Sequence, residues 1–271
     1  MRDPLEIARE CGGAVARALA ELPGREEREP VVATGVGGDE TTVVDARAEE
    51  AVVGVLEQLA HDGTSFTLVS EELGERTYGD RAAALRIVVD PIDGSLNAKR
   101  GIPLFALSIA FADGPTMGDV FCGYVVDYGT GEEWTAIRGE GARLGGEPLA
   151  VSPPKDEIEI LVMEATRTDL LADKAAAMVG FAYRTRVFGS LALSLCHLAA
   201  GRVDAVCSLK GARSVDIAAA QLLVRERGLA IDLPEDPPFA AAPLDLEPRS
   251  RVVAGATDGV CRELFARLGE R

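Results

Sequence analysis

Two kinds of hydrophobic period alternate along the first half of the chain. Apolar residues recur every three to four positions over 3–22 and 43–61, which predicts two amphipathic helices. Short apolar runs rich in β-branched residues predict strands at 65–69, 85–89, 105–111, 117–126 and 133–137. Glycine-containing turns join the last three runs and favour an antiparallel sheet. Polar stretches at 25–29, 34–45 and 73–81 predict loops.

The rhythm changes beyond Ser152-Pro153-Pro154-Lys155, which we interpret as a hinge. Predicted strands at 158–163, 185–187 and 205–208 are each followed by a predicted helix, at 170–179, 190–200 and 215–227. Two strands at 229–232 and 251–254 and a helix at 258–268 complete the chain. This alternation is typical of an α/β unit. We therefore predict an N-terminal α+β half at 1–152 and a C-terminal α/β half at 153–271.

Charge narrows the classes of binding partner, and cysteine content indicates the cellular compartment. The formal net charge is -16 and the pI about 4.6, so non-specific attraction to nucleic acid or to an anionic membrane is not expected. Five scattered cysteines without C-x-x-C spacing are typical of buried thiols in a reducing cytoplasm. No signal peptide is recognisable, and no apolar run approaches the roughly 18 residues of a membrane span. We expect a cytoplasmic protein.

The basic residues are almost all arginine, since lysine occurs only at positions 99, 155, 174 and 210. Acid excess with scarce lysine suits a cytosol of high salt, although a GC-rich genome gives the same arginine bias. Halophily is a hypothesis, and stability that falls steadily as potassium chloride rises would contradict it.

One short stretch gathers polar side chains at the end of a predicted strand. Asp90-Pro91 ends the apolar run at 85–89, so we expect Asp90 at a strand's carboxyl end with Asp93 beside it. Gly94 lets the backbone approach a ligand or adopt a positive φ. Two carboxylates this close repel one another unless protons or cations intervene, and oxygen donors without Cys or His favour Mg²⁺ or Mn²⁺. The alternative is an ordinary turn, because D-P and D-G pairs are common in turns.

Further acidic residues lie at predicted element ends in the first half. Thr42 and Asp45 have the spacing of a capping box, in which the hydroxyl can also hold a water molecule. Glu71 and Glu72 follow a strand; adjacent glutamates are usually solvated, unless that strand end points the same way as Asp90.

In the second half, Asp216 opens an almost wholly apolar helix. An acidic residue there is ordinarily a cap or a partner of the helix dipole. Lys210 and Arg213 precede it closely, which makes a second role plausible. The two histidines, His61 and His197, lack zinc-ligand spacing and are interpreted as structural.

Four motifs occur in a fixed order: T-T-V-V-D-A-R-A-E at 41–49, V-S-E-E at 69–72, V-D-P-I-D-G-S-L-N at 89–97 and V-D-I-A-A-A at 215–220. Together they resemble the inositol monophosphatase family of magnesium-dependent, lithium-sensitive phosphatases, over nearly the whole chain. The segments at 33–42, 101–110 and 188–204 are most similar to the archaeal branch. Several members of that branch act on both inositol monophosphate and fructose 1,6-bisphosphate.

The resemblance implies a layered αβαβα sandwich, with an antiparallel sheet in the N-terminal half, a mixed sheet in the C-terminal half and the active site between them. It also implies a homodimer and two or three Mg²⁺ ions, with Mn²⁺ possible. By motif position, the first ion is held by Glu71, Asp90 and the carbonyl of Ile92. The second is held by Asp90, Asp93 and Asp216, and a weaker third contacts Glu71 and Ser95.

The same motif positions imply the catalytic and substrate-binding groups. Thr42 and Asp45 are implied to activate the attacking water, and Glu71 and Ser95 complete the implied catalytic set. Substrate contacts are implied for Asp93, Gly94, Ser95, Gly189, Ser190 and Asp216. The backbone N–H groups of Gly94 and Ser95 would bind the phosphate, as exposed donors at a turn can.

Departures from the family pattern concern the choice of substrate. Leu209 stands where animal members place a glutamate that contacts inositol hydroxyls, and leucine cannot make those hydrogen bonds. We expect nearby cations to reach a second phosphate or sugar hydroxyls: Arg184, Arg186, Lys210 and Arg213. The sequence therefore predicts a phosphatase that accepts a sugar bisphosphate, such as fructose 1,6-bisphosphate, as well as inositol phosphates.

Other functions stay open at this point. Within the same family, a 3′-phosphoadenosine 5′-phosphate or NADP phosphatase is an alternative. From another class, a non-catalytic magnesium-binding regulatory homologue is disfavoured by the intact acidic set. A sugar kinase lacks any P-loop signature in this sequence.

Overall fold

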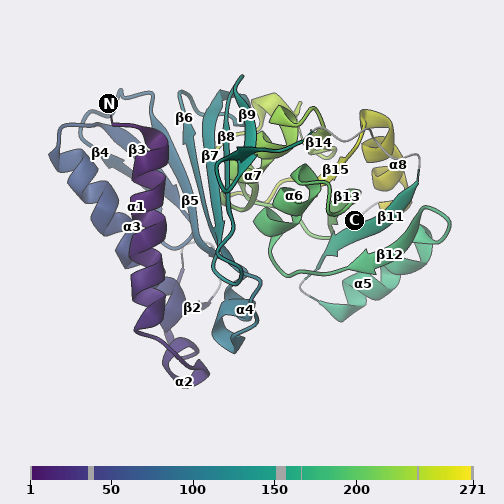
Figure 1. Ribbon diagram of the computed structural model, residues 1–271, viewed down its shortest axis with the longest axis horizontal. Coiled ribbons are helices and arrows are strands. Elements are labelled where there is room, and N and C mark those ends of the chain that lie inside the picture. The colour runs from purple at the N-terminus through teal and green to yellow at the C-terminus, as the bar shows by residue number, and fades with distance from the viewer. Residues whose placement is uncertain (1, 36–39, 151–156, 166, 237, 270–271) are drawn as a thin grey trace.

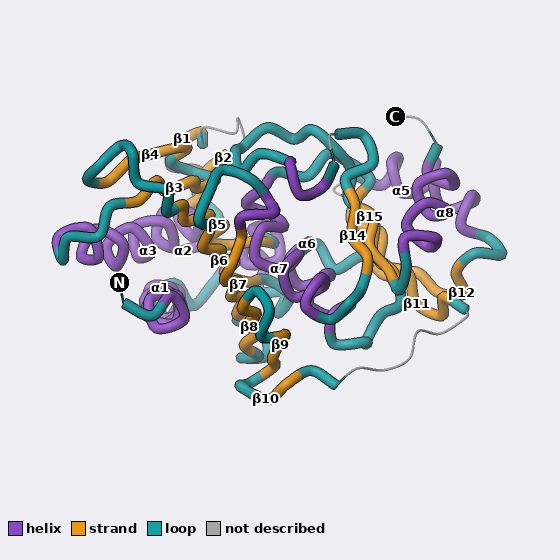
Figure 2. Tube along the Cα trace, turned by 90° about the horizontal axis from the view of Figure 1, so that it is seen from above, coloured by secondary structure: helices purple, strands orange, loops and turns teal. Residues whose placement is uncertain are grey.

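Five layers of helices and strands stack along the long axis of the molecule (Figure 1). The computed structural model describes residues 2–35, 40–150, 157–165, 167–236 and 238–269. From one end to the other, the layers are a helix pair, a large sheet, a second helix pair, a smaller sheet and outer helices, an order also seen from above (Figure 2). Hydrophobic clusters fill the interfaces between the layers. The predicted αβαβα sandwich is confirmed.

The first layer pairs α1 (Pro4–Ala20) with α3 (Val43–His61). Asp3 caps α1 by accepting a hydrogen bond from the N–H of Leu5 at 3.0 Å, and Pro4 suits the first helical position because it needs no donor there. Apolar side chains at helical spacing on both helices pack against the large sheet.

In the described residues the large sheet has eight strands, in the order β10-β9-β8-β7-β6-β5-β3-β4. Their bounds are β3 (Phe66–Ser70), β4 (Gly74–Tyr78), β5 (Arg86–Asp93), β6 (Ala106–Ala112), β7 (Val120–Asp127), β8 (Glu133–Ile137), β9 (Gly141–Leu144) and β10 (Glu147–Pro148). Neighbours are antiparallel except β3 and β5, which are parallel. Because β3 and β5 run the same way, the glutamates that follow β3 and the aspartates at the end of β5 meet at one edge.

The middle layer consists of α6 (Leu191–Ala199) and α7 (Ser214–Glu226), both of which are almost entirely buried between the sheets. Helix α7 lies close against β7. A Cβ atom built on Gly123 of β7 would come within 2.5 Å of the carbonyl oxygen of Ala219 on α7, so only glycine fits there. An apolar helix with small residues on its sheet-facing side can pack at this distance. This places the start of α7, with Asp216, beside the large sheet.

The smaller sheet has the order β12-β11-β13-β15-β14 in the described part of the chain and is mixed, as predicted. Its strands are β11 (Ile158–Glu164), β12 (Ala182–Arg186), β13 (Ala205–Ser208), β14 (Ala230–Asp232) and β15 (Val253–Gly255). Helices α5 (Thr168–Ala175) and α8 (Asp258–Leu268) cover its outer face. The proposed hinge and the boundary between 152 and 153 lie outside the described residues, so the division into halves stays a prediction.

Several polar segments were predicted wrongly as loops. Residues 25–29 contain the one-turn helix α2 (Arg25–Arg28), and residues 73–81 contain β4, whose side chains are mostly exposed. The segment 34–45 carries strand β2 (Glu40–Thr42), paired with β1 (Val31–Thr34). Edge strands and short hairpins can be polar because one face is solvated, so their sequences lack an apolar signal.

Strand β5 also departs from the prediction, since it continues to Asp93 rather than stopping at Asp90-Pro91. Its pairing with β6 shifts register between Asp90 and Asp93, and proline is tolerated at such a bulge because it has no N–H to pair. The remaining short elements are α4 (Ser95–Arg100) and the 3₁₀ turns η1 (Met117–Asp119), η2 (Ala176–Met178) and η3 (Phe239–Ala241).

The prediction that the cysteines are buried is confirmed, because all five thiols are buried and unbridged. The helices of the described residues include none that is long and apolar enough to cross a membrane.

Candidate active site

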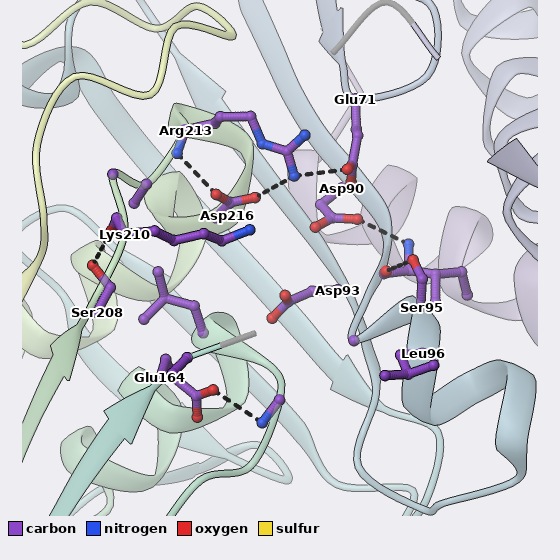
Figure 3. Close-up of a pocket in the computed structure, with 17 residues that line it drawn as sticks. Glu71, Asp90, Asp93, Ser95, Leu96, Glu164, Ser208, Lys210, Arg213 and Asp216 are labelled. Atoms are coloured by element: carbon purple, nitrogen blue, oxygen red, sulfur yellow. Dashed lines mark hydrogen bonds and ion pairs between the residues drawn. The ribbon is translucent and has the colours of Figure 1, made fainter. Parts of the chain in front are cut away.

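A pocket of about 230 Å³ opens where the ends of β3, β5 and β11 meet the segments before α6 and α7 (Figure 3). It brings together residues that are widely separated in the chain. Of the residues predicted for the site, ten line it: Glu71, Asp90, Ile92, Asp93, Gly94, Ser95, Gly189, Lys210, Arg213 and Asp216. The four acidic side chains in this set come from three separate segments.

Asp90 and Asp93 are both buried at the end of β5. Asp90 is held by the N–H of Ile92, which donates to its Oδ1 at 3.0 Å. Burial raises the pKa of Asp90 well above its usual range, and the nearby charges of Glu71, Asp93 and Asp216 raise it further. Burial likewise raises the pKa of Asp93 to about 7. The surroundings of each carboxylate therefore disfavour its negative charge, which a bound cation or a proton would neutralise.

Glu71 and Asp216 share the guanidinium of Arg213. Its Nη2 lies 2.7 Å from Oε1 of Glu71 and 3.1 Å from Oδ1 of Asp216 (Figure 3). Asp216 also caps α7, because its Oδ2 accepts the backbone N–H of Arg213 at 2.8 Å. The predicted capping role is confirmed, and Asp216 lies at the pocket as well.

Oxygen donors of this kind suit Mg²⁺, since the set has carboxylates and lacks Cys and His. Within the described ranges, however, no three acidic, imidazole or thiol side chains are gathered tightly enough to hold a metal ion as they stand. The guanidinium of Arg213 lies between the carboxylates of Glu71 and Asp216 and contacts both of them. The donor chemistry thus fits a divalent cation, and Arg213 competes for the same oxygens.

Asp93 is fixed by donors at the start of α6. The hydroxyl of Ser190 and the N–H of Ala192, the latter at 2.7 Å, both donate to Oδ2 of Asp93. Ser190 does not line the pocket itself but is buried behind Asp93.

Gly94 allows the β5–α4 turn to pass close to its neighbours. Its φ of 94° lies in the left-handed region, and a Cβ atom there would come within 2.9 Å of the carbonyl oxygen of Leu104. The next residue, Ser95, donates its hydroxyl to the carbonyl of Ile92 at 3.0 Å. Gly94 and Ser95 both line the pocket, and because Gly94 has no side chain, its backbone is not covered there.

Thr42 and Asp45 form the predicted capping box at the start of α3, and both are buried. The hydroxyl of Thr42 donates to Oδ2 of Asp45 at 2.5 Å, which leaves Oδ1 of Asp45 without a hydrogen-bond partner. Neither residue lines the pocket. Nearby Thr41 donates to Glu72, which follows Glu71.

Arg184 and Arg186 are not brought to the pocket. Both lie on the exposed edge strand β12, where Arg184 pairs with Glu159 at 2.9 Å and Arg186 donates to the carbonyl of Thr185. Their part in substrate binding remains a prediction.

Glu164 is a pocket residue that the sequence reasoning did not single out. It ends β11, is buried, and accepts hydrogen bonds from the N–H groups of Phe188 and Gly189, each at 3.0 Å. Its sequence signal is an acidic residue at the end of an apolar strand, the same signal that pointed to Glu71 and Asp90.

Comparison with known proteins agrees with this fold. Residues 5–268 match the inositol monophosphatase family, and the chain belongs to that family. It is 34% identical over 224 residues to the fructose-1,6-bisphosphatase/inositol-1-monophosphatase of Methanothermobacter thermautotrophicus, covering 79% of this chain and 78% of that protein. It is 30% identical over 254 residues to a bifunctional NADP phosphatase/NAD kinase of Methanocaldococcus jannaschii, covering 82% of this chain and 43% of that protein.

Among solved structures, the crystal structure of an inositol monophosphatase-fructose 1,6 bisphosphatase matches with a TM-score of 0.83 at 25% identity. The match covers 98% of this chain and 99% of the other. The family and these relatives indicate that the protein is a phosphatase.

Proposed function

We propose that the protein is a Mg²⁺-dependent phosphomonoesterase that hydrolyses small sugar or polyol phosphates, with fructose 1,6-bisphosphate and inositol monophosphate as its substrates. The observation that carries this proposal is the meeting of Glu71, Asp90, Asp93 and Asp216 at one pocket. The pKa values of the first three are raised by burial and by mutual repulsion, which is the electrostatic setting of a cation site.

Glu71, Asp90, Asp93, Asp216 and the carbonyl of Ile92 would hold the metal. When bound, divalent cations supply a nucleophile at neutral pH and neutralise charge on the leaving oxygen. The chain itself contributes binding and orientation. The N–H groups of Gly94 and Ser95 would bind the phosphate oxygens. The family resemblance gives Thr42 and Asp45 the attacking water, although neither residue lines the pocket in this structure.

Substrate choice depends on Lys210 in this proposal. Lys210 and Arg213 are the cationic side chains among the described residues that line the pocket, and Arg213 already contacts two carboxylates. The side chain of Lys210 is exposed and extends toward the carboxylates (Figure 3). It is therefore the better placed of the two to bind a second phosphate. Leu209 is buried in the outer core and offers no polar contact to inositol.

The test is phosphate release from a panel of fructose 1,6-bisphosphate, inositol 1-phosphate, 3′-phosphoadenosine 5′-phosphate and NADP, with and without Mg²⁺. Turnover of the first two, abolished by Asp93→Asn, supports the proposal. Turnover confined to the nucleotides moves the assignment to the alternative that the NADP phosphatase relative suggests. Absence of turnover of any phosphomonoester leaves the regulatory homologue.

Lys210→Ala then separates the two substrates. It should raise KM for the bisphosphate about tenfold or more, in line with the loss of a charge-assisted contact worth about 1.5–3 kcal/mol, and leave KM for inositol 1-phosphate nearly unchanged. Lys174→Ala on the outer helix α5 is the matched control for loss of one lysine. Equal effects of Lys210→Ala on both substrates would count against this role.

A further inference from the structure

The turn at 188–190 joins the C-terminal half to the β5–α4 segment of the N-terminal half. Asn97, on α4, donates to the carbonyls of Phe188 and Leu104, each at 2.7 Å. The two segments approach so closely that a Cβ atom built on Gly94 would come within 3.2 Å of the carbonyl oxygen of Gly189. The turn at 188–190 and the backbone at Gly94 are therefore in close contact.

The same turn determines the position of Asp93. Ser190 is the last residue of the turn and caps α6, since its Oγ accepts the N–H of Leu193 at 3.2 Å. It also donates its own proton to Oδ2 of Asp93, which the N–H of Ala192 binds as well. One oxygen of Asp93 is thus occupied by the second half, and the other is left for the pocket.

Glu164 anchors this turn from behind. Its Oε1 accepts the N–H of Phe188 and its Oε2 accepts the N–H of Gly189. The two oxygens of one carboxylate thus bind two successive backbone donors. Ser194 adds its hydroxyl to Oε1 at 2.7 Å. Buried carboxylates that accept several backbone donors are rigid supports, because breaking any one bond leaves a buried group unpaired.

We propose that Glu164 is a positioning residue for the reaction: it holds the 188–190 turn so that Ser190 fixes Asp93 in the orientation that binds the cation. The inference rests on the proposed function, because it needs Asp93 to act as a metal ligand. Groups that orient a metal ligand through hydrogen bonds matter for metal affinity as well as for stability.

The experiment measures Mn²⁺ affinity by titration calorimetry in the absence of substrate. Glu164→Gln keeps the shape but directs an amide N–H₂ at a backbone N–H, so one hydrogen bond is lost. It should weaken Mn²⁺ binding about tenfold. Glu164→Ala loses every hydrogen bond and should weaken it more. Glu159→Gln, on the same strand but exposed and paired with Arg184, is the control and should bind Mn²⁺ as the wild type does.

A double-mutant cycle separates positioning from a general loss of stability. If Glu164 acts through Ser190, then Ser190→Ala combined with Glu164→Gln should bind Mn²⁺ no more weakly than Ser190→Ala alone. Circular dichroism at the assay temperature verifies that each variant is folded. Wild-type Mn²⁺ affinity in folded Glu164→Gln, or fully additive losses in the double variant, would overturn the positioning role.

The wild type and Asp93→Asn distinguish this inference from the proposed function. Mn²⁺ binding that Asp93→Asn abolishes, together with an unaffected Glu164→Gln, refutes only the role of Glu164. Wild-type protein that binds no Mn²⁺, or binding that Asp93→Asn leaves unchanged, overturns both.

Discussion

Arg213 and Glu71 are joined across the pocket by an ion pair of 2.7 Å, in which each side chain is only 16% exposed. The guanidinium reaches Glu71 from the segment before α7, so the pair links the end of β3 in the large sheet to the start of a helix in the middle layer. It also places a positive charge on an oxygen of Glu71 that a metal ion would need. The structure thus carries its own cation at this edge of the carboxylate cluster.

Arg213→Gln should therefore affect the metal-free protein most. Removing one partner of a buried pair leaves an uncompensated charge, and we expect a loss of about 3 kcal/mol in the free energy of unfolding in EDTA. Saturating Mg²⁺ should reduce this loss, because a divalent cation replaces the missing charge and binds only the folded state. Urea unfolding with and without Mg²⁺ measures both values.

The control for Arg213→Gln is Arg138→Gln, which breaks the exposed pair of Arg138 with Asp113. That change should cost less than about 1 kcal/mol under both conditions. An equal loss for Arg213→Gln in EDTA and in Mg²⁺ would show that the guanidinium and the metal do not share the carboxylates.

Gly94 offers a test of the close approach at the phosphate-binding turn. Gly94→Ala must adopt a positive φ and also place a methyl group 2.9 Å from the carbonyl oxygen of Leu104. Gly101→Ala has a similar φ of 71° but meets nothing within 4 Å, so it isolates the backbone strain of about 1–2 kcal/mol. We expect a larger stability loss and a much larger fall in kcat/KM for Gly94→Ala. Similar kinetics for the two variants would contradict a role for this turn.

Glu49 makes the stability of the protein depend on pH. It is buried on α3 and accepts the hydroxyl of Ser70 at 2.6 Å, and burial raises its pKa to about 7. Between about pH 4.5 and about pH 7, the folded state holds a proton that the unfolded state has lost. Raising the pH through this window therefore lowers the free energy of unfolding. The contribution of Glu49 to stability is greatest below the window.

Glu49→Gln is the matched variant, because the amide oxygen can still accept the hydroxyl of Ser70 and no charge develops. Its free energy of unfolding in EDTA should fall less than that of the wild type between about pH 4.5 and about pH 7. Parallel pH profiles for the two proteins would mean that Glu49 titrates near its ordinary pKa.

The hydrophobic period was sufficient to predict most buried elements. Strand β13 and helix α8 have the predicted bounds, because an apolar run between turn residues and an amphipathic run after a capping threonine are strong local signals. The polar edge strand β4 was missed, since its pairing with β3 depends on backbone hydrogen bonds and not on its own side chains.

The candidate site was predictable to the extent that it lies at strand ends and helix starts. Asp90 and Asp216 could each be recognised locally, whereas their meeting depends on how α7 packs against the large sheet. The same limit explains the misses. Glu164 ends a strand as Glu71 does, but its partners at 188–189 are distant in sequence, and Arg184 is a cation whose strand proves to be an exposed edge.

The central claim is that carboxylates far apart in the chain form one cation site, and Asp216→Asn tests it most directly. Asparagine can still cap α7, so the helix start is preserved while the charge is lost. The account predicts Mg²⁺-dependent phosphate release from fructose 1,6-bisphosphate by the wild type and a fall in kcat of at least about a hundredfold in the folded variant. Wild-type hydrolysis that persists in EDTA, or an unimpaired Asp216→Asn enzyme, would contradict it.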